Sequence, residues 1–361
     1  MKILHAGGKM SVGGAERAIF QLIRAQRSAG VDADLLVSAS PGYYGHQVSE
    51  MGAKVFEIGM RNGWDISVKN RFFDIIKNYT VLHFHGPAPA LMYLSQAQGG
   101  CRLFYTHRAG AFNYPLKRLL SYKISGYFFR KSFVRISGNT KHAALVASRL
   151  FRIPLKKIPF TYNGIDFSLL KPKRSKQEVL LELGDLSKDV VRIGTTANIR
   201  KWKRIHYLLK AVGKLRSYPI HCYVIGDGPA RKGLEKLSED LGLTDIVTFT
   251  GQKKEVADYL NILDIFILPS NSGESFGNSA VEAMAVEIPT VVMRDGGGLV
   301  EHIIDGGGFI AESFSDIPII LRKLCESQTL CLRVGEKGKR YVMGKYTIDN
   351  MVNSYARFYC D

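Results

Sequence analysis

The chain has 361 residues, of which 46% are hydrophobic and 36 are glycine, and its formal net charge is +18. Such a length fits two domains of about 100–200 residues each, and the composition excludes an intrinsically disordered chain. Five scattered cysteines without CxxC spacing argue against a disulfide framework or a cysteine metal site, and they predict reduced thiols in a cytoplasmic protein.

The N-terminal segment and the hydropathy pattern predict neither a signal peptide nor a transmembrane helix. Residues 2–7 begin directly with a strand-like pattern instead of a charged and then apolar leader. No uninterrupted apolar stretch approaches the length of about 18 residues that a membrane-spanning helix needs. We therefore expect a protein without a leader or a membrane anchor.

The positive charge is unevenly distributed. No Asp or Glu occurs from Ile75 to Ile165, while Lys and Arg recur throughout this stretch. An asymmetry of this kind points to a polyanionic partner, which could be an anionic membrane, a nucleic acid or a phosphorylated substrate. The alternative interpretation is a solvated basic face.

In the first half of the chain, strand patterns alternate with helix patterns. Strands are predicted at residues 2–6, 34–38, 53–58, 81–85, 103–107 and 134–137. This alternation predicts βαβ units and a parallel sheet. A glycine-rich loop at residues 7–16 follows the first strand and opens a helix, but it lacks GxGxxG spacing, so a dinucleotide site is the less favoured interpretation.

Two further features of the first half carry functional hypotheses. His107 ends a predicted strand, where open α/β sheets bind their ligands, although a lone histidine is more often structural. Residues 112–135 interleave aromatic and aliphatic residues with Lys and Arg. Such a stretch can lie on an anionic membrane surface, or it can be an internal helix with a basic rim, and Gly126 leaves open whether one helix is continuous.

The second half repeats the alternation after a predicted hinge at residues 171–176. A strand at residues 190–197 is followed by the basic cluster of residues 200–204 and then by a helix. Cations gathered where a strand meets a helix suit a diphosphate group. A solvated helix start would explain them less well, because positive charge there opposes the helix dipole.

Two carboxylates bracket a second strand-to-helix turn. An apolar, strand-like run at residues 265–270 precedes a Gly/Ser/Asn-rich loop with Glu274, and a helix with Glu282 follows. Backbone N–H groups at such a helix start bind anions or hydroxyls, and an ionised carboxylate accepts hydrogen bonds from sugar and ribose hydroxyls. An ordinary loop with a capping glutamate is the alternative for either residue alone.

The pair Glu274 and Glu282 resembles the E-x7-E motif of the GT4-like family of retaining glycosyltransferases, which have the GT-B fold. Further motifs are similar to those of the family: the GGxE loop at residues 13–16, Asn-Gly-Ile-Asp at 163–166, G-x-G-P at 226–229 and F-x-G at 249–251. The resemblance implies an α/β protein with two Rossmann-like, doubly wound parallel-sheet domains facing a cleft. The implied domains are an acceptor-binding domain at residues 1–170, a nucleotide-sugar-binding domain at 171–340 and a C-terminal helix at 341–361 that crosses back.

The resemblance also assigns site residues. It implies catalytic roles for His107, Lys203 and Glu274, and acceptor binding by Gly13 and Glu16. Residues implied in donor binding are Gly14, Asn198, Arg200, Gly226, Gly251, Lys253, Phe276, Gly277, Asn278, Ser279 and Glu282. Two positions depart from the family pattern: Arg108 follows His107 where the family usually has Asp, and Asn198 stands where it has Arg.

The function implied by the resemblance is transfer of a hexose-type sugar from a UDP- or GDP-linked donor with retention of configuration. No metal and no cofactor beyond the nucleotide sugar is expected. The acceptor is expected to be a glycan or a lipid-linked or anionic molecule of bacterial surface polysaccharide or lipopolysaccharide synthesis, used at the inner face of the cytoplasmic membrane. The alternatives are a nucleotide-sugar epimerase of the same fold and, less favoured, a basic nucleic-acid-binding or regulatory protein.

Overall fold

The computed structural model describes residues 1–111, 116–131 and 134–360. Residues 1–164 and 348–361 form one compact unit, and residues 165–347 form a second. The predicted amphipathic stretch at 112–135 lies in part outside the described residues. Its described part is a continuous helix that runs through Gly126.

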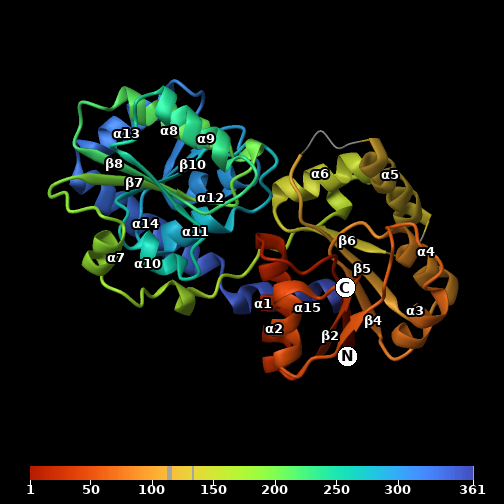
Figure 1. The fold of residues 1–361 in the computed structure, drawn as a ribbon. Helices are drawn as coiled ribbons and strands as arrows, with labels where there is room; N and C mark the ends of the chain where they lie inside the picture. Colours follow the sequence, from red (N-terminus) through yellow and green to blue (C-terminus); the bar gives the residue numbers. More distant parts are fainter. Residues whose placement is uncertain (112–115, 132–133, 361) are drawn as a thin grey trace. The chain divides into compact units, whose positions relative to one another are not determined.

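The first unit is built around a six-stranded parallel sheet with the strand order β3-β2-β1-β4-β5-β6 (Figure 1). Its strands are β1 Lys2–Ala6, β2 Asp32–Val37, β3 Val55–Glu57, β4 Val81–Phe84, β5 Arg102–His107 and β6 Arg135–Gly138. Its helices are α1 Gly14–Ser28, α2 Gly42–Glu50, α3 Lys69–Ile76, α4 Pro89–Gln98, α5 Leu116–Lys131, α6 Lys141–Phe151 and α15 Ile348–Cys360. The strands read as apolar runs because helices cover both faces of the sheet.

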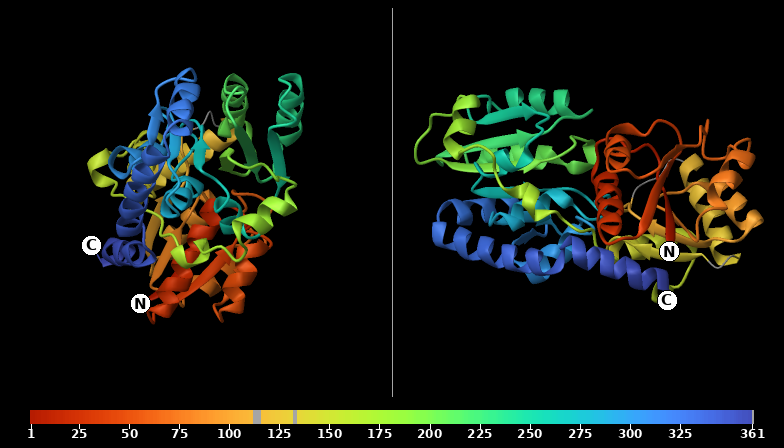
Figure 2. Two further views of the ribbon diagram at one scale, coloured as in Figure 1. Left: turned by 90° about the vertical axis from the view of Figure 1, so that its left-hand side faces the viewer. Right: turned by 90° about the horizontal axis from the view of Figure 1, so that it is seen from below.

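Two groups of helices cover the two faces of this sheet. Helices α3 to α6 enclose a core that includes Phe72, Tyr105 and Phe151. The last helix, α15, lies beside α1 on the other face (Figures 1 and 2), where Tyr355 and Phe358 join Leu22 and Phe104 in the core. The C-terminal helix is therefore an integral part of the first unit.

A close helix contact explains the glycine in α5. A Cβ atom built on Gly126 would lie 2.8 Å from the Cα atom of Phe151. Any larger residue would push α5 away from α6, so Gly126 allows close packing and does not interrupt the helix.

The second unit has the same architecture, with the strand order β12-β11-β10-β7-β8-β9. Its strands are β7 Val191–Thr196, β8 Ile220–Ile225, β9 Val247–Gly251, β10 Ile265–Leu268, β11 Thr290–Met293 and β12 Phe309–Ala311. Its helices are α7 Lys176–Glu182, α8 Ile205–Lys214, α9 Arg231–Asp240, α10 Val256–Leu260, α11 Asn278–Ala285, α12 Leu299–Gly306, α13 Asp316–Cys325 and α14 Gln328–Lys345. Short 3-10 segments are η1 Leu155–Lys157 in the first unit, and η2 Phe167–Leu170 and η3 Lys201–Lys203 in the second.

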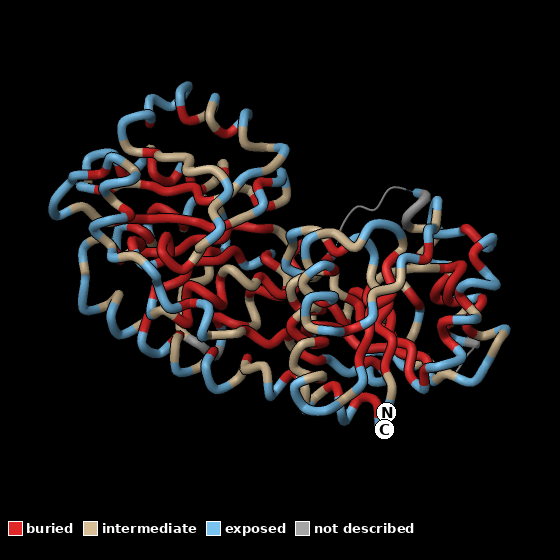
Figure 3. Tube along the Cα trace, turned by 60° about the horizontal axis from the view of Figure 1, so that its bottom comes forward, coloured by how far each residue is buried: buried red, intermediate tan, exposed pale blue. Residues whose placement is uncertain are grey.

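In the second unit, α8, α9 and α13 cover one face of the sheet, and α11, α12 and α14 cover the other (Figure 1). Figure 3 shows that the strands of each unit are buried while the outer sides of the helices are exposed. The two doubly wound parallel sheets confirm the predicted fold class.

Candidate functional site

The strand order of the second unit defines where a ligand is expected to bind. Strand β7 lies between β8 and β10. The chain adds β8 and β9 on one side of β7, and then β10, β11 and β12 on the other side. The loops after β7 and β10 therefore diverge at the carboxyl edge, and open α/β sheets bind ligands in the crevice at such a topological switch point. Residues 197–204 and 269–277 form these two loops.

An ion pair joins the two loops across the switch point. The Nζ atom of Lys203 lies 2.5 Å from the Oε2 atom of Glu274, and each side chain is only 11% exposed. The Ser270 hydroxyl donates to the same carboxylate oxygen at 3.3 Å. The Lys203 ammonium also lies 4.5 Å from the centroid of the Trp202 ring. Two of the predicted catalytic residues are thus brought together as one buried pair.

Gly277 fixes the start of helix α11 beside this pair. Its φ angle of 76° is left-handed, and a Cβ atom there would lie 2.2 Å from Leu299 Cδ2. Only glycine fits that position. Asn278 and Ser279 open the helix, and the Glu282 side chain is 4% exposed in its second turn.

Two residues that the sequence analysis missed hold the loop after β10 in place. The Phe276 carbonyl accepts a hydrogen bond from Nε2 of His302 at 2.7 Å, and Tyr346 lies 2.7 Å from Nδ1 of the same ring. A carbonyl can only accept, so Nε2 carries the proton and the Tyr346 hydroxyl donates to Nδ1. Burial lowers the pKa of His302 to about 4. No sequence pattern marks His302, since it is 26 residues from Phe276.

The loop after β8 packs tightly on the loop after β7. Gly226 has a φ angle of 131°, and a Cβ atom there would lie 2.0 Å from the Ala197 carbonyl oxygen. Its N–H donates to the carbonyl of Gly251 at the end of β9. Asn198 and Arg200 are exposed on the same edge, where the Arg200 Nε atom lies 3.4 Å from Asn198 Oδ1.

Lys253, another predicted donor-binding residue, contacts Glu182 and Tyr259 of the second unit. Its ammonium lies 2.8 Å from a Glu182 carboxylate oxygen and 4.8 Å from the Tyr259 ring centroid. The Glu182 hydrogen bond is the largest cause of the raised pKa of Lys253.

The predicted residues of the first unit lie at the carboxyl edge of its own sheet, whose switch point is between β1 and β4. Gly13 caps α1 with extended backbone, and the Glu16 carboxylate folds back over it, because a Cβ on Gly13 would lie 2.2 Å from Glu16 Oε2. Gly14 is the exposed first residue of the helix. His107 ends β5, is 1% exposed, and its Nδ1 atom lies 3.2 Å from the Tyr105 hydroxyl.

Within the described residues, one group of three metal-ligating side chains gathers, at the β1/β4 switch point: His5, His83 and His85. Nε of Arg108 donates to Nδ1 of His85 at 3.1 Å. The His85 proton is therefore on Nε2, which donates to Nδ1 of His5 at 2.9 Å, and Nε2 of His5 donates to Gln26 Oε1 at 2.7 Å.

His83 belongs to the same network and bonds Tyr359 and Thr106 through its two ring nitrogens. Burial lowers the pKa of His5 to about 4 and holds the pKa values of His83 and His85 well below 6.5. Because the ring nitrogens are engaged in hydrogen bonds and a guanidinium adjoins them, the cluster is a neutral network that disfavours a bound cation.

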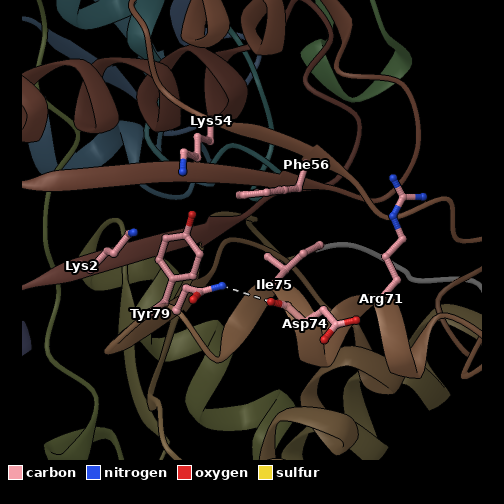
Figure 4. Close-up of a pocket in the computed structure, with 8 residues that line it drawn as sticks. Lys2, Lys54, Phe56, Arg71, Asp74, Ile75 and Tyr79 are labelled. Carbon is pink, nitrogen blue, oxygen red and sulfur yellow. Dashed lines mark hydrogen bonds between the residues drawn. The ribbon is translucent and has the colours of Figure 1, made fainter.

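A hollow of about 620 Å³ lies at the opposite, amino edge of the first sheet (Figure 4). Figure 4 shows Lys2 and Lys54 near the Tyr79 ring, with Arg71 beyond Ile75. Lys2 already pairs with Asp32, and the end of helix α3 forms one wall. The cations that line this hollow are explained by the negative end of the α3 dipole, so they do not require a ligand. Because open α/β sheets bind ligands at their carboxyl edges, we place the candidate site there.

Comparison with known families agrees with this geometry. Residues 185–341 match the family described as "Glycosyl transferases group 1", and residues 12–169 match "Glycosyltransferase Family 4". A lipopolysaccharide core biosynthesis glycosyltransferase LpsE of Rhizobium meliloti is 25% identical over 96% of this chain and 95% of its own. A lipopolysaccharide 1,2-N-acetylglucosaminetransferase of Salmonella typhimurium is 29% identical over 56% of each chain.

Solved structures show the same fold. HepE of Anabaena, in a complex with UDP and glucose, matches with a TM-score of 0.85 and 18% identity over 99% of this chain and 98% of its own. WaaG, a glycosyltransferase involved in lipopolysaccharide biosynthesis, matches with a TM-score of 0.72 and 14% identity over 99% of both chains.

Proposed function

Because the chain belongs to the GT4-like, group 1 family of glycosyltransferases, we propose that it transfers a hexose-type sugar from a nucleotide-diphosphate donor with retention of configuration. The observation that carries the proposal is the buried Lys203–Glu274 pair at the β7/β10 switch point. At this place a cation can bind the diphosphate of a donor, and a carboxylate can accept hydrogen bonds from the sugar hydroxyls of the same donor.

The chemical barrier is the departure of a negatively charged nucleoside diphosphate from an oxocarbenium-like sugar. Lys203 would stabilise the leaving charge, assisted by Arg200 and by backbone N–H groups at the start of α11. Glu274 would accept hydrogen bonds from sugar hydroxyls, and Glu282 from the ribose. With these cations placed on the protein, we propose that the reaction needs no metal ion.

We further propose that the first unit binds a glycan or lipid-linked acceptor with anionic character. The acid-free stretch from Ile75 to Ile165 makes up β4 to β6 and their connecting helices, so the field at this part of the unit is positive. The relatives named for lipopolysaccharide synthesis agree with an acceptor of bacterial surface polysaccharide or lipopolysaccharide assembly. His107 would contact the donor sugar.

A thermal-shift panel of UDP- and GDP-sugars tests the donor site. We expect one nucleotide series to raise Tm by several degrees, since ligand at 100 times its Kd stabilises the folded state by about 2.7 kcal/mol. Glu282→Gln should weaken that ligand by about 10- to 100-fold, because hydrogen bonds to a charged acceptor contribute about 1.5–3 kcal/mol.

The exposed Glu312, which pairs with Arg294 on the surface, supplies the control variant Glu312→Gln. This variant should keep the full Tm shift. Failure of every nucleotide sugar to stabilise the protein would refute the donor site, and full stabilisation of the Glu282→Gln variant would refute the role of Glu282.

Helix α5 supports association with an anionic membrane surface. Leu116, Leu120, Lys123 and Tyr127 recur at helical spacing, and the three apolar side chains are 81%, 51% and 49% exposed. An apolar and basic face of this kind binds the lipid headgroup region. No helix among the described residues is long and apolar enough to cross a bilayer.

We expect the protein to sediment with phosphatidylglycerol vesicles and to dissociate from them as salt increases. Leu120→Glu combined with Tyr127→Glu should lower the bound fraction at least fivefold, because each change removes apolar contact and adds repulsion. Leu332→Glu combined with Met343→Glu, at two exposed apolar residues of α14, introduces the same charge elsewhere and should bind as the wild type does. Equal binding of all three proteins would contradict the assignment to α5.

A further inference from the structure

Arg108 holds a half-buried guanidinium at the carboxyl edge of the first sheet. It follows the last residue of β5, and its side chain reaches three neutral groups on three separate segments. Nε donates to His85 at 3.1 Å, Nη1 to Asn163 Oδ1 at 2.8 Å and Nη2 to the Tyr355 hydroxyl at 3.0 Å. Three of its five N–H donors are thus assigned, which leaves one on each Nη atom.

The charge of Arg108 has no counter-ion in the part of the chain that the structure describes. No carboxylate there lies within ion-pair distance of its guanidinium, in contrast to Arg174 and Arg192, which pair with Asp258 and Asp185. The His85 and His5 rings behind it are neutral. A partly buried charge without a counter-ion is costly to keep, so this position calls for a partner that the chain does not itself supply.

The surroundings of Arg108 leave room for an anion and favour its negative charge. His85, its nearest partner, follows β4 directly, so the guanidinium lies beside the β1/β4 switch point. Cβ atoms built on Gly8 and Gly86, in the loops after β1 and β4, would meet no atom within 4 Å. Helix α4 begins at the same edge without a side-chain cap and without an acidic residue in its first turn, which adds positive potential.

We propose that Arg108 is a specificity-determining residue that binds a carboxylate or phosphate group of the acceptor substrate. That the anion belongs to an acceptor substrate rests on the proposed transferase function, whereas the anion site itself rests on the contacts of Arg108. The two remaining Nη donors suit the two oxygens of such a group. Arg108 would thereby select anionic over neutral acceptors.

The test follows the ring nitrogens of His85 by NMR in histidine-labelled protein during titration with inorganic phosphate at constant ionic strength. UDP or GDP, whichever stabilises the protein in the thermal-shift panel, is present at saturation to occupy the donor site. Phosphate should shift the Nδ1 resonance of His85 saturably, because it pairs with the Arg108 guanidinium that donates to this atom. Acetate, titrated in the same way, distinguishes carboxylate from phosphate recognition.

Two variants separate binding from structural support. Tyr355→Phe removes one hydrogen bond from the guanidinium but keeps its charge, so the phosphate affinity should change less than threefold. Arg108→Lys keeps a cation but loses the paired donors and should bind at least tenfold more weakly. Arg108→Gln, where it folds, should show no saturable shift.

A His85 resonance that does not saturate in the wild type, or an Arg108→Lys variant that binds phosphate as tightly as the wild type, would overturn the proposal. The transferase proposal fails independently if neither UDP nor GDP stabilises the protein in a thermal-shift assay while phosphate still shifts the His85 resonance. Both outcomes are read from the same samples.

Discussion

Replacing Lys203 by methionine is expected to lower kcat/KM for sugar transfer by about 100- to 1000-fold, the effect of removing one group that stabilises developing charge. The same change leaves the Glu274 carboxylate buried without its cation. Breaking a buried ion pair from one side costs about 3–5 kcal/mol, so the variant should also unfold at lower urea concentration.

The two effects can be separated by experiment. Activity is measured at a temperature where urea titration shows the variant fully folded. Arg294→Met, which breaks an exposed ion pair with Glu312, serves as the control and should change the unfolding free energy by only about 0–1 kcal/mol with little loss of activity. A Lys203→Met variant that retained wild-type kcat/KM would exclude Lys203 from the reaction.

Acidification from pH 7.5 to pH 5 is expected to destabilise the first unit steeply. His5, His83 and His85 have folded-state pKa values below the usual 6.5, that of His5 being about 4, because burial disfavours the charged imidazolium. The unfolded chain therefore binds more protons below pH 6.5. Stability is complete above that pH and is lost as the pH falls through it, by up to about 1.4 kcal/mol per pH unit for each histidine.

Urea unfolding followed at several pH values measures this slope. His83→Gln has a side chain that can still hydrogen-bond both Tyr359 and Thr106. It removes one titrating group and should lower the slope by about 1.4 kcal/mol per pH unit. His46→Gln, at an exposed histidine, should leave the slope unchanged. A pH-independent unfolding free energy between pH 7.5 and 5 would show that the three rings are not held neutral.

Sequence reasoning was strongest where local pattern and chemistry coincide. The apolar run at residues 265–270, followed by a Gly/Ser/Asn loop and a helix, predicted the strand, turn and helix of β10 and α11, although β10 ends at Leu268. Gly277 has the left-handed backbone that such a turn requires. The alternation of these patterns along the chain predicted two parallel doubly wound sheets, since a short βα repeat has few other ways to bury its apolar strands.

The sequence predicted residues of the candidate site but not their contacts. The sequence singled out Lys203 and Glu274 separately, but their contact joins residues 71 positions apart. His302 and Tyr346 gave no signal at all, because a buried histidine that supports a loop resembles any other core residue until its partners are known. The predicted helix at residues 112–135 had an open question at Gly126, which the contact with Phe151 answers.

By itself, then, the sequence determined the fold class, the family and the residue types available for chemistry, because periodicity, turn residues and motif spacing are local properties of the chain. Only the tertiary structure decided which of those residues meet. Sheet order places the loops after β7 and β10 side by side and so creates the Lys203–Glu274 pair. It also brings α15 back to β1, β4 and β5, where burial and hydrogen bonding fix the protons of three histidines and leave Arg108 as a cation without a counter-ion among the described residues.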